Sequence, residues 1–277
     1  MLITSSNHET PNSELRTLWE QGPPFATLLI ALEEALARAE ATRTNKLLLW
    51  GERVSGISSY LAGWMAGGGI DVIVLDGANG FDPYTVSSFA RRALIPPERL
   101  LKRIQIARAF TCYQMATLVE RLASLLRQRE TPQTESFPSP FQCLSARRQG
   151  QGGRGAVKVI LLGPITTFLD EDVPEREVEP LFERSLRKVE RMAEAGVPFF
   201  LFQSYASSQN HSGREVGKRS PFNKGTAQGS VGSKRAHLMK RLFQFSNLTW
   251  RVSLKEEGPK LILEKGPMEN IRDQIAD

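Results

Sequence analysis

The segment Lys46-Leu47-Leu48-Leu49-Trp50-Gly51-Glu52-Arg53-Val54-Ser55-Gly56-Ile57-Ser58 decides how this chain is interpreted. Its first five residues predict a short buried strand, and residues 51–58 have the spacing of a phosphate-binding loop that ends in a Ser or Thr. In that motif a lysine precedes the hydroxyl residue and reaches the phosphates, but here the position holds Ile57. An apolar side chain cannot neutralise a triphosphate. The pattern therefore predicts a nucleotide-binding fold whose hydrolytic chemistry is lost or weakened.

Four residues of this octapeptide remain candidates for binding a nucleotide: Gly51, Ser55, Gly56 and Ser58. Glycines allow backbone N–H groups to face a phosphate, and a Ser hydroxyl in this position can hold magnesium. Ser58 is an equally good candidate for the N-cap of the following helix. The motif thus predicts that ATP binding is weak or absent.

The composition indicates one α/β domain with extensions, since the chain has 277 residues of which 40% are hydrophobic. No apolar run approaches the length of a membrane span, and the first residues lack the apolar core of a secretory signal. We therefore expect a cytoplasmic protein that does not associate with membranes. Two cysteines and three histidines are too few and too scattered for a zinc centre, so no metal cofactor is predicted.

Short apolar runs alternate with helical patterns along the chain, which predicts a mostly parallel sheet with helices on both faces. We expect strands at 46–50, 71–76, 104–108, 157–162 and 198–202, and near 241–245, 249–254 and 260–264 in an antiparallel region spanning 235–265. We expect helices at 23–43, 58–66, 83–93, 113–128 and 178–195. The predicted division is an N-terminal tail and helix (1–44), a core (45–267) with a flexible insertion (129–155) and a long loop (204–233), and a C-terminal tail (268–277).

Positive charge is concentrated in residues 204–241, which carry eight basic residues and one acid, Glu215, for a formal charge of +7. The whole chain has a charge of +6, so the remainder is close to neutral. A local basic segment on a near-neutral body is typical of a surface that binds a polyanion. A solvated loop with no ligand would show the same composition, and the charge pattern alone does not separate the two.

Several stretches, in order, resemble the RecA-type recombinases, and most closely their archaeal RadA and eukaryotic branch. After the octapeptide, residues 74–83 are similar to the family's hydrophobic-Asp-Thr-Glu-x-x-Phe-Arg-Pro stretch. Residues 104–120 (IQIARAFTCYQMATLVE) resemble its Val-Ala-Arg-Ala-Tyr, Gln-Met and Leu-Val-Glu elements, and this is the most distinctive match. Residues 199–203 and Ala236-His237 resemble the segments on either side of its second DNA-binding loop. The resemblance covers residues 45–267.

This resemblance implies a RecA-like NTPase fold with a C-terminal antiparallel extension, and it assigns roles to further residues. Gln203 would sense a γ-phosphate and signal to the DNA-binding loop. The residues that would contact DNA are Arg214, Lys218, Arg219, Lys224, Lys234 and Arg235. The departures fall on the chemistry, because Ile57 replaces the lysine, Ala78 the catalytic glutamate and Gly163 the magnesium-linked aspartate. Since one preorganised electrostatic group is worth about 3–4 kcal/mol, losing three makes useful turnover implausible.

The leading hypothesis is a catalytically degenerate protein of DNA recombination or repair that binds DNA, assists a competent recombinase, or does both. A second hypothesis is a non-catalytic subunit that docks on a partner ATPase without touching DNA. A third is an ATPase to which a partner subunit supplies the missing cation. A small-molecule enzyme is the class least favoured, because no Ser/His/Asp, Cys/His or paired-carboxylate set has an informative spacing.

Overall fold

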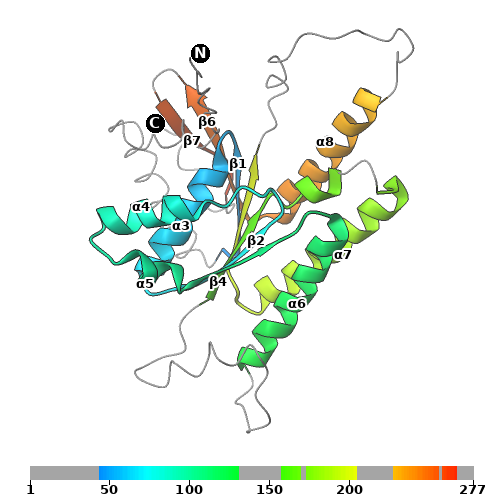
Figure 1. Ribbon diagram of the computed structural model, residues 1–277. Helices are drawn as coiled ribbons and strands as arrows, with labels where there is room; N and C mark the ends of the chain where they lie inside the picture. Colours follow the sequence, from blue (N-terminus) through cyan, green and yellow to red (C-terminus); the bar gives the residue numbers. More distant parts are fainter. Residues whose placement is uncertain (1–43, 131–156, 170–172, 205–226, 256–257, 267–277) are drawn as a thin grey trace, which may run out of the picture.

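The computed structural model describes residues 44–130, 157–169, 173–204, 227–255 and 258–266 (Figure 1). These residues form a seven-stranded sheet with the order β3-β2-β4-β5-β1-β6-β7. The strands are β1 (Lys46–Gly51), β2 (Asp71–Asp76), β3 (Ile104–Arg108), β4 (Val157–Leu162), β5 (Phe199–Ser204), β6 (Leu248–Lys255) and β7 (Gly258–Lys265). All neighbouring strands pair in parallel except β6 and β7, which form an antiparallel pair at one edge.

Helices cover both faces of the sheet (Figure 1). One face carries α3 (Val54–Gly67), α4 (Pro83–Arg92) and α5 (Pro97–Leu101), and the other carries α6 (Cys112–Glu130), α7 (Glu175–Glu194) and α8 (Ala227–Phe245). A short 3-10 helix, η3 (Thr166–Leu169), follows β4. This arrangement confirms the α/β class and the mostly parallel sheet with a C-terminal antiparallel pair.

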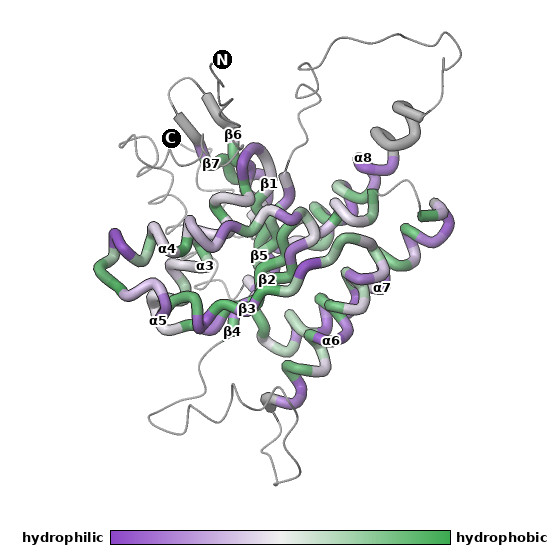
Figure 2. Tube along the Cα trace, in the orientation of Figure 1, coloured by the Kyte–Doolittle hydropathy of each residue, from purple (hydrophilic) through white to green (hydrophobic). Residues whose placement is uncertain are grey.

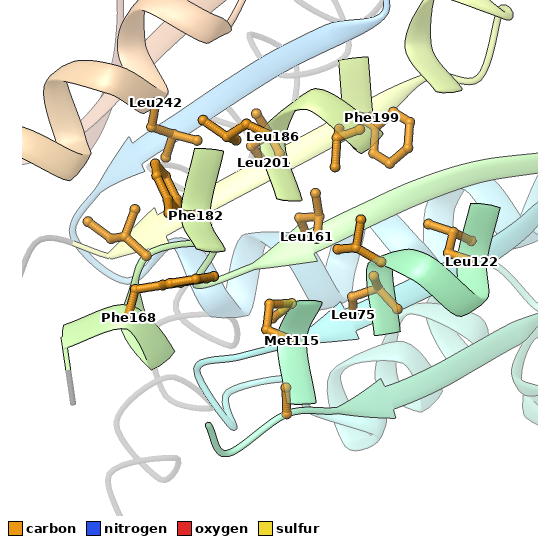
Figure 3. Close-up of a cluster of buried hydrophobic side chains, with 14 of the residues drawn as sticks. Leu75, Met115, Leu122, Leu161, Phe168, Phe182, Leu186, Phe199, Leu201 and Leu242 are labelled. Carbon is orange, nitrogen blue, oxygen red and sulfur yellow. The ribbon is translucent and has the colours of Figure 1, made fainter. Parts of the chain in front are cut away.

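The core is divided by the sheet because successive strand residues point to opposite faces. Along β1, Leu47 and Leu49 pack beneath α3, whereas Leu48 packs with α6, α7 and α8. Figure 3 shows the second cluster, in which Phe168 and Phe182 meet edge to face beside the central strands. Strands buried on both faces read as continuous apolar runs, which is why β1, β2, β4 and β5 were predictable from the sequence.

The prediction of an antiparallel β region at 235–265 was wrong for its first expected strand. Residues 241–245, expected as a strand, belong to helix α8, which begins at Ala227 inside the expected loop. Leu238 and Leu242 are buried four positions apart, the spacing of a helix face rather than of a strand. Strand β6 also pairs in parallel with β1, so the antiparallel region is limited to β6 and β7.

Several expectations lie outside the described residues. These are the N-terminal tail and the helix at 23–43, the insertion at 129–155 apart from its first two residues, the part of the long loop between 205 and 226, and the C-terminal tail. Within the part of the chain that the structure describes, no helix has the length and apolar character needed to cross a membrane.

Candidate functional site

The carboxyl end of β1, where the octapeptide begins, is shaped by its neighbour β6. Gly51 has a φ of 131°, and a Cβ atom added there would lie 2.1 Å from the backbone oxygen of Val252. Glu52 then donates a backbone hydrogen bond to the same oxygen, at 3.4 Å. Only glycine allows the two strands to approach this closely. The first glycine of the motif is therefore required by sheet packing, whether or not a phosphate binds.

The rest of the octapeptide is helical rather than an extended loop. Helix α3 begins at Val54, four residues earlier than the motif spacing predicted, and so contains Ser55, Gly56 and Ser58. Ser58 is therefore not the N-cap, and that alternative was wrong; Arg53 occupies the cap position with a φ of 53°. The early start follows from the sequence, because Val54, Ile57 and Leu61 place three buried apolar residues on one helical stripe.

Ile57, at the position of the missing lysine, lies in the hydrophobic core. Ile57 is only 4% exposed, and it packs in one cluster with Val54, Leu61 and apolar residues of the strands beneath α3. Ser58 is fully buried, and its hydroxyl donates a 2.6 Å hydrogen bond to the backbone oxygen of Ser55. Both side chains are inaccessible to a phosphate in solvent, and the Ser58 hydroxyl is already engaged within the helix.

The two positions expected for catalytic acids pack directly against each other. Gly163 has a φ of 65°, and an added Cβ would lie 2.6 Å from the Ala78 Cβ and 2.7 Å from the Thr166 Oγ1. Gly77, beside Ala78, donates a backbone hydrogen bond to Leu162 at 2.8 Å and would place a Cβ 2.6 Å from the Met115 Cε. The small residues thus let the ends of β2 and β4 close on each other. They leave no room for a carboxylate at position 163.

Asp76, at the end of β2, organises the loop that follows it and was not singled out from the sequence. Its carboxylate is completely buried and accepts backbone hydrogen bonds from Ala78, Gly80 and Phe81 at 3.1–3.2 Å. The Arg108 Nε lies 3.5 Å from the same carboxylate. Three backbone donors and a guanidinium compensate the buried charge. The sequence signal was present in Asp76-Gly77-Ala78-Asn79-Gly80, an aspartate followed by turn-forming residues.

Gln203 lies at the end of β5, next to β4 and the turn that follows it. It is buried, its Oε1 accepts a hydrogen bond from the backbone N–H of Ile165 at 3.2 Å, and its Nε2 donates to the Ser204 oxygen at 3.2 Å. Gly163 completes the connection by donating to the Phe202 oxygen at 2.7 Å. The amide therefore fastens β5 to the turn after β4, through groups that the protein itself supplies.

The candidate DNA-binding residues are only partly within the described chain. Arg214, Lys218, Arg219 and Lys224 lie outside it, whereas Lys234 and Arg235 lie on α8 and are half-buried. Further along α8, Arg241 donates two hydrogen bonds to Glu183 of α7, at 2.5 and 2.8 Å. These bonds hold the pKa of the Glu183 carboxyl below its usual value. Arg241, which contributed to the +7 count, is therefore committed to holding α8 on α7.

Taken together, the residues at the carboxyl ends of the strands do not fit a magnesium nucleotide. Ile57, where the motif would place its lysine, is in the core, and the Ser58 hydroxyl is bonded within the helix. Position 163, where the magnesium-linked aspartate would lie, is closed by Ala78 and Thr166. Among the described residues, no group of three or more His, Cys, Asp or Glu side chains is placed to hold a metal ion. What the arrangement provides instead is a set of hydrogen bonds from the Asp76 carboxylate and the Gln203 amide to the backbone of the neighbouring turns.

A scan against models of protein families finds no match to this chain, and a search of curated protein sequences finds none either.

Proposed function

We propose that this chain is a catalytically degenerate RecA-like protein that acts in DNA recombination or repair. In this proposal it binds DNA, assists a competent recombinase, or does both, and it does not hydrolyse ATP itself. The observation that carries the proposal is the burial of Ile57 in the core beneath a helix that begins at Val54. The ordered motifs suggest the RecA-type recombinases, and the burial of Ile57 supports a role that no longer depends on nucleotide hydrolysis.

The loss of catalysis is supported at three separate positions. A triphosphate needs a cation where Ile57 stands, and hydrolysis needs groups that orient water and hold magnesium where Ala78 and Gly163 stand. Because Gly163 is packed against Ala78, an aspartate at position 163 could not be restored by a change of side chain alone. Electrostatic groups of this kind supply most of the acceleration in phosphoryl transfer, so their combined absence favours a binding role over an enzymatic one.

A direct role with DNA is supported by the charge of residues 204–241, which begin at the end of β5 and run into α8. Backbone phosphates are bound by Lys and Arg side chains, and release of counterions makes such binding strongly dependent on salt. Gln203 precedes this segment and is held by the turn after β4. The proposal therefore expects DNA binding that is the same with and without ATP.

A second candidate function, docking on a partner ATPase, is favoured by the exposed edge at β3. Strand β3 pairs only with β2 among the described strands, and Ile106 and Phe110 at this edge are 40% and 65% exposed. Large apolar side chains beside the outer edge of an edge strand are features of protein-binding sites. Under this alternative the fold is a scaffold, and the protein modifies the assembly of an active recombinase.

The two candidates are separated by neutralising the basic segment. The test variant replaces five cations by glutamine: Lys218, Arg219, Lys224, Lys234 and Arg235. Fluorescence anisotropy with labelled single-stranded and duplex DNA is measured at two salt concentrations. The matched control replaces Arg176, Arg187 and Arg191, which are exposed on α7, by glutamine.

The proposal expects the test variant to lose salt-sensitive binding and the control variant to keep it. Equal binding by wild type and test variant would contradict a DNA-binding role for this segment. Absence of any wild-type binding at low salt would remove the direct DNA role and leave the docking candidate.

A further inference from the structure

The connection between α4 and α5 carries a leucine that the fold itself does not use. Leu94 is 93% exposed, and its φ of 57° lies in the left-handed region that residues other than Gly, Asn and Asp seldom adopt. In Figure 2 the connection appears as a hydrophobic stretch at the outer end of α4, bordered by hydrophilic residues. A large apolar side chain in water on an unfavourable backbone is a feature that local folding does not explain.

The backbone geometry shows why glycine would suit this position better. The N–H of Leu94 bonds to the Arg91 oxygen at 3.2 Å, and the N–H of Ile95 bonds to the Ala90 oxygen at 2.9 Å. These two bonds form a Schellman motif at the end of α4, in which the left-handed residue is usually glycine. The apolar contact that accompanies the motif is made by Ile95, which packs against the core beneath α3. Leu94 contributes strain without a packing contact to offset it.

Basic side chains surround this leucine in the chain. Arg91 and Arg92 occupy the last turn of α4, Arg99 lies in α5, and Lys102 caps the end of α5. The one acid between residues 91 and 102 is Glu98. Helices α4 and α5 pack against each other, and all four cations are exposed. We call the exposed side chains of Arg91, Arg92, Leu94, Arg99 and Lys102 the α4–α5 surface.

The α4–α5 surface lies on the opposite face of the sheet from α8. Helix α4 starts beyond the carboxyl end of β2 and returns to the end of the sheet where β2 and β3 begin. There the N–H of Val72, in β2, bonds to the Arg103 oxygen at 2.9 Å, just after α5. The α4–α5 surface is therefore separate from α8, the helix that the structure describes within residues 227–245, and can be tested independently of it.

We propose that the α4–α5 surface is a second contact for duplex DNA, with its cations on backbone phosphates and Leu94 inserted between base pairs from the minor groove. This inference rests on the proposed role in DNA recombination or repair. Minor-groove proteins combine Arg and Lys contacts with an inserted apolar side chain, often Leu, that partly unstacks a base step. A single leucine among four cations matches this pattern better than a protein-binding site, where leucine is under-represented among the dominant residues.

The test uses a labelled duplex that contains a flexible TA step with 2-aminopurine beside it, so that unstacking is seen as increased fluorescence. Two variants of the full chain are compared with wild type: Leu94→Gly, and a triple change of Arg91, Arg99 and Lys102 to glutamine. The triple change of Arg176, Arg187 and Arg191 to glutamine on α7 serves as the matched control. Affinity is measured by anisotropy over a range of salt concentrations.

The α4–α5 triple variant should reduce the slope of log affinity against log salt by about 2 to 3, since each phosphate contact contributes about 0.9. Leu94→Gly should weaken duplex binding about tenfold, abolish the 2-aminopurine signal and leave the salt slope unchanged. Because glycine relieves the backbone strain, the melting temperature of the Leu94→Gly variant should stay level or rise by about 1–3 °C. Unfolding is then excluded as the cause of the weaker DNA binding.

Unchanged slope and affinity in both variants, with wild-type binding intact, would overturn this inference and leave the proposed function standing. A lower melting temperature for Leu94→Gly would show that the leucine is structural and would also overturn it. If the α4–α5 triple variant loses binding of poly-L-glutamate but keeps wild-type affinity and salt slope for the duplex, the surface takes an acidic protein instead, which refutes the DNA contact. If wild type binds no DNA at low salt, the inference fails together with the proposed function.

Discussion

Replacing Ile57 by lysine restores the residue that a phosphate-binding motif would carry, and it distinguishes a closed site from an open one. In an open site the new ammonium would face solvent or nucleotide, and the fold would tolerate it. In the structure described here, position 57 is 4% exposed and is surrounded by apolar residues of α3 and the central strands. The substitution therefore places a charge in the core.

The expected loss of stability can be worked from this burial. Removing the isoleucine side chain from the core costs about 1.5–3 kcal/mol. Lysine must also be neutralised to remain buried, and lowering its pKa from about 10.4 to near 7 costs about 4–5 kcal/mol. The sum of about 6–8 kcal/mol is comparable with the whole stability of many domains, which is about 5–15 kcal/mol. We expect the melting temperature to fall by at least about 15 °C.

Thermal unfolding followed by circular dichroism, with and without magnesium and ATP, measures this effect. Ile57→Val is the control, for which the loss should be about 0.5–1.5 kcal/mol and independent of nucleotide. A lysine variant that melts within a few degrees of wild type and is stabilised by ATP would refute the reasoning. That result would mean that residues 51–58 still form an open nucleotide site, and it would revive an ATPase completed by a partner subunit.

Three further predictions concern the residues around this edge. Gly163→Ala should destabilise the fold by about 3 kcal/mol or more, measured by urea unfolding, because its Cβ meets Ala78 at 2.6 Å on a left-handed backbone; an unchanged midpoint would show that the two turns can separate. Asp76→Asn should cost roughly 3 kcal/mol in the same assay, since one carboxylate oxygen that accepts from the loop becomes an amide donor; equal stability would mean that the loop does not depend on this charge. The hydrogen bonds from Arg241 lower the pKa of Glu183 in the folded state, so their stabilisation exists above the unfolded pKa and is lost as pH falls through the folded one. The difference in melting temperature between wild type and Arg241→Gln should accordingly be largest near neutral pH and shrink below about pH 4, and a pH-independent difference would contradict this origin.

The centre of the sheet could be predicted from the sequence because β1, β2, β4 and β5 are buried on both faces and read as short apolar runs. The predicted ranges 71–76, 104–108 and 157–162 coincide with β2, β3 and β4. Short elements were missed, since α5 (Pro97–Leu101) and η3 (Thr166–Leu169) are too brief to show a period. Residues 241–245 were assigned to a strand because local apolar content was weighed above the helical spacing of Leu238 and Leu242.

The candidate site illustrates a different limit. The sequence identified Ile57, Ala78 and Gly163 as departures from a catalytic pattern. It did not show which residues occupy the space that the lysine and the two acids would fill. That Gly163 touches Ala78 depends on β2 and β4 being neighbours, which no local signal records. The start of α3 was misplaced because the motif spacing suggested a loop, whereas the apolar stripe from Val54 to Leu61 continues the helix. Leu94 gave no sequence signal at all, because its left-handed backbone occurs at a residue type where it is not expected.

The measurement that tests the central claim most directly is fluorescence anisotropy of the full chain with labelled single-stranded and duplex DNA. It is made at low and at physiological salt, each with and without magnesium and ATP. The account predicts binding that weakens steeply with salt and is unchanged by ATP, because cations contact the phosphates and Gln203 is held by the protein's own backbone. Absence of binding at low salt, or binding that requires ATP, would contradict it.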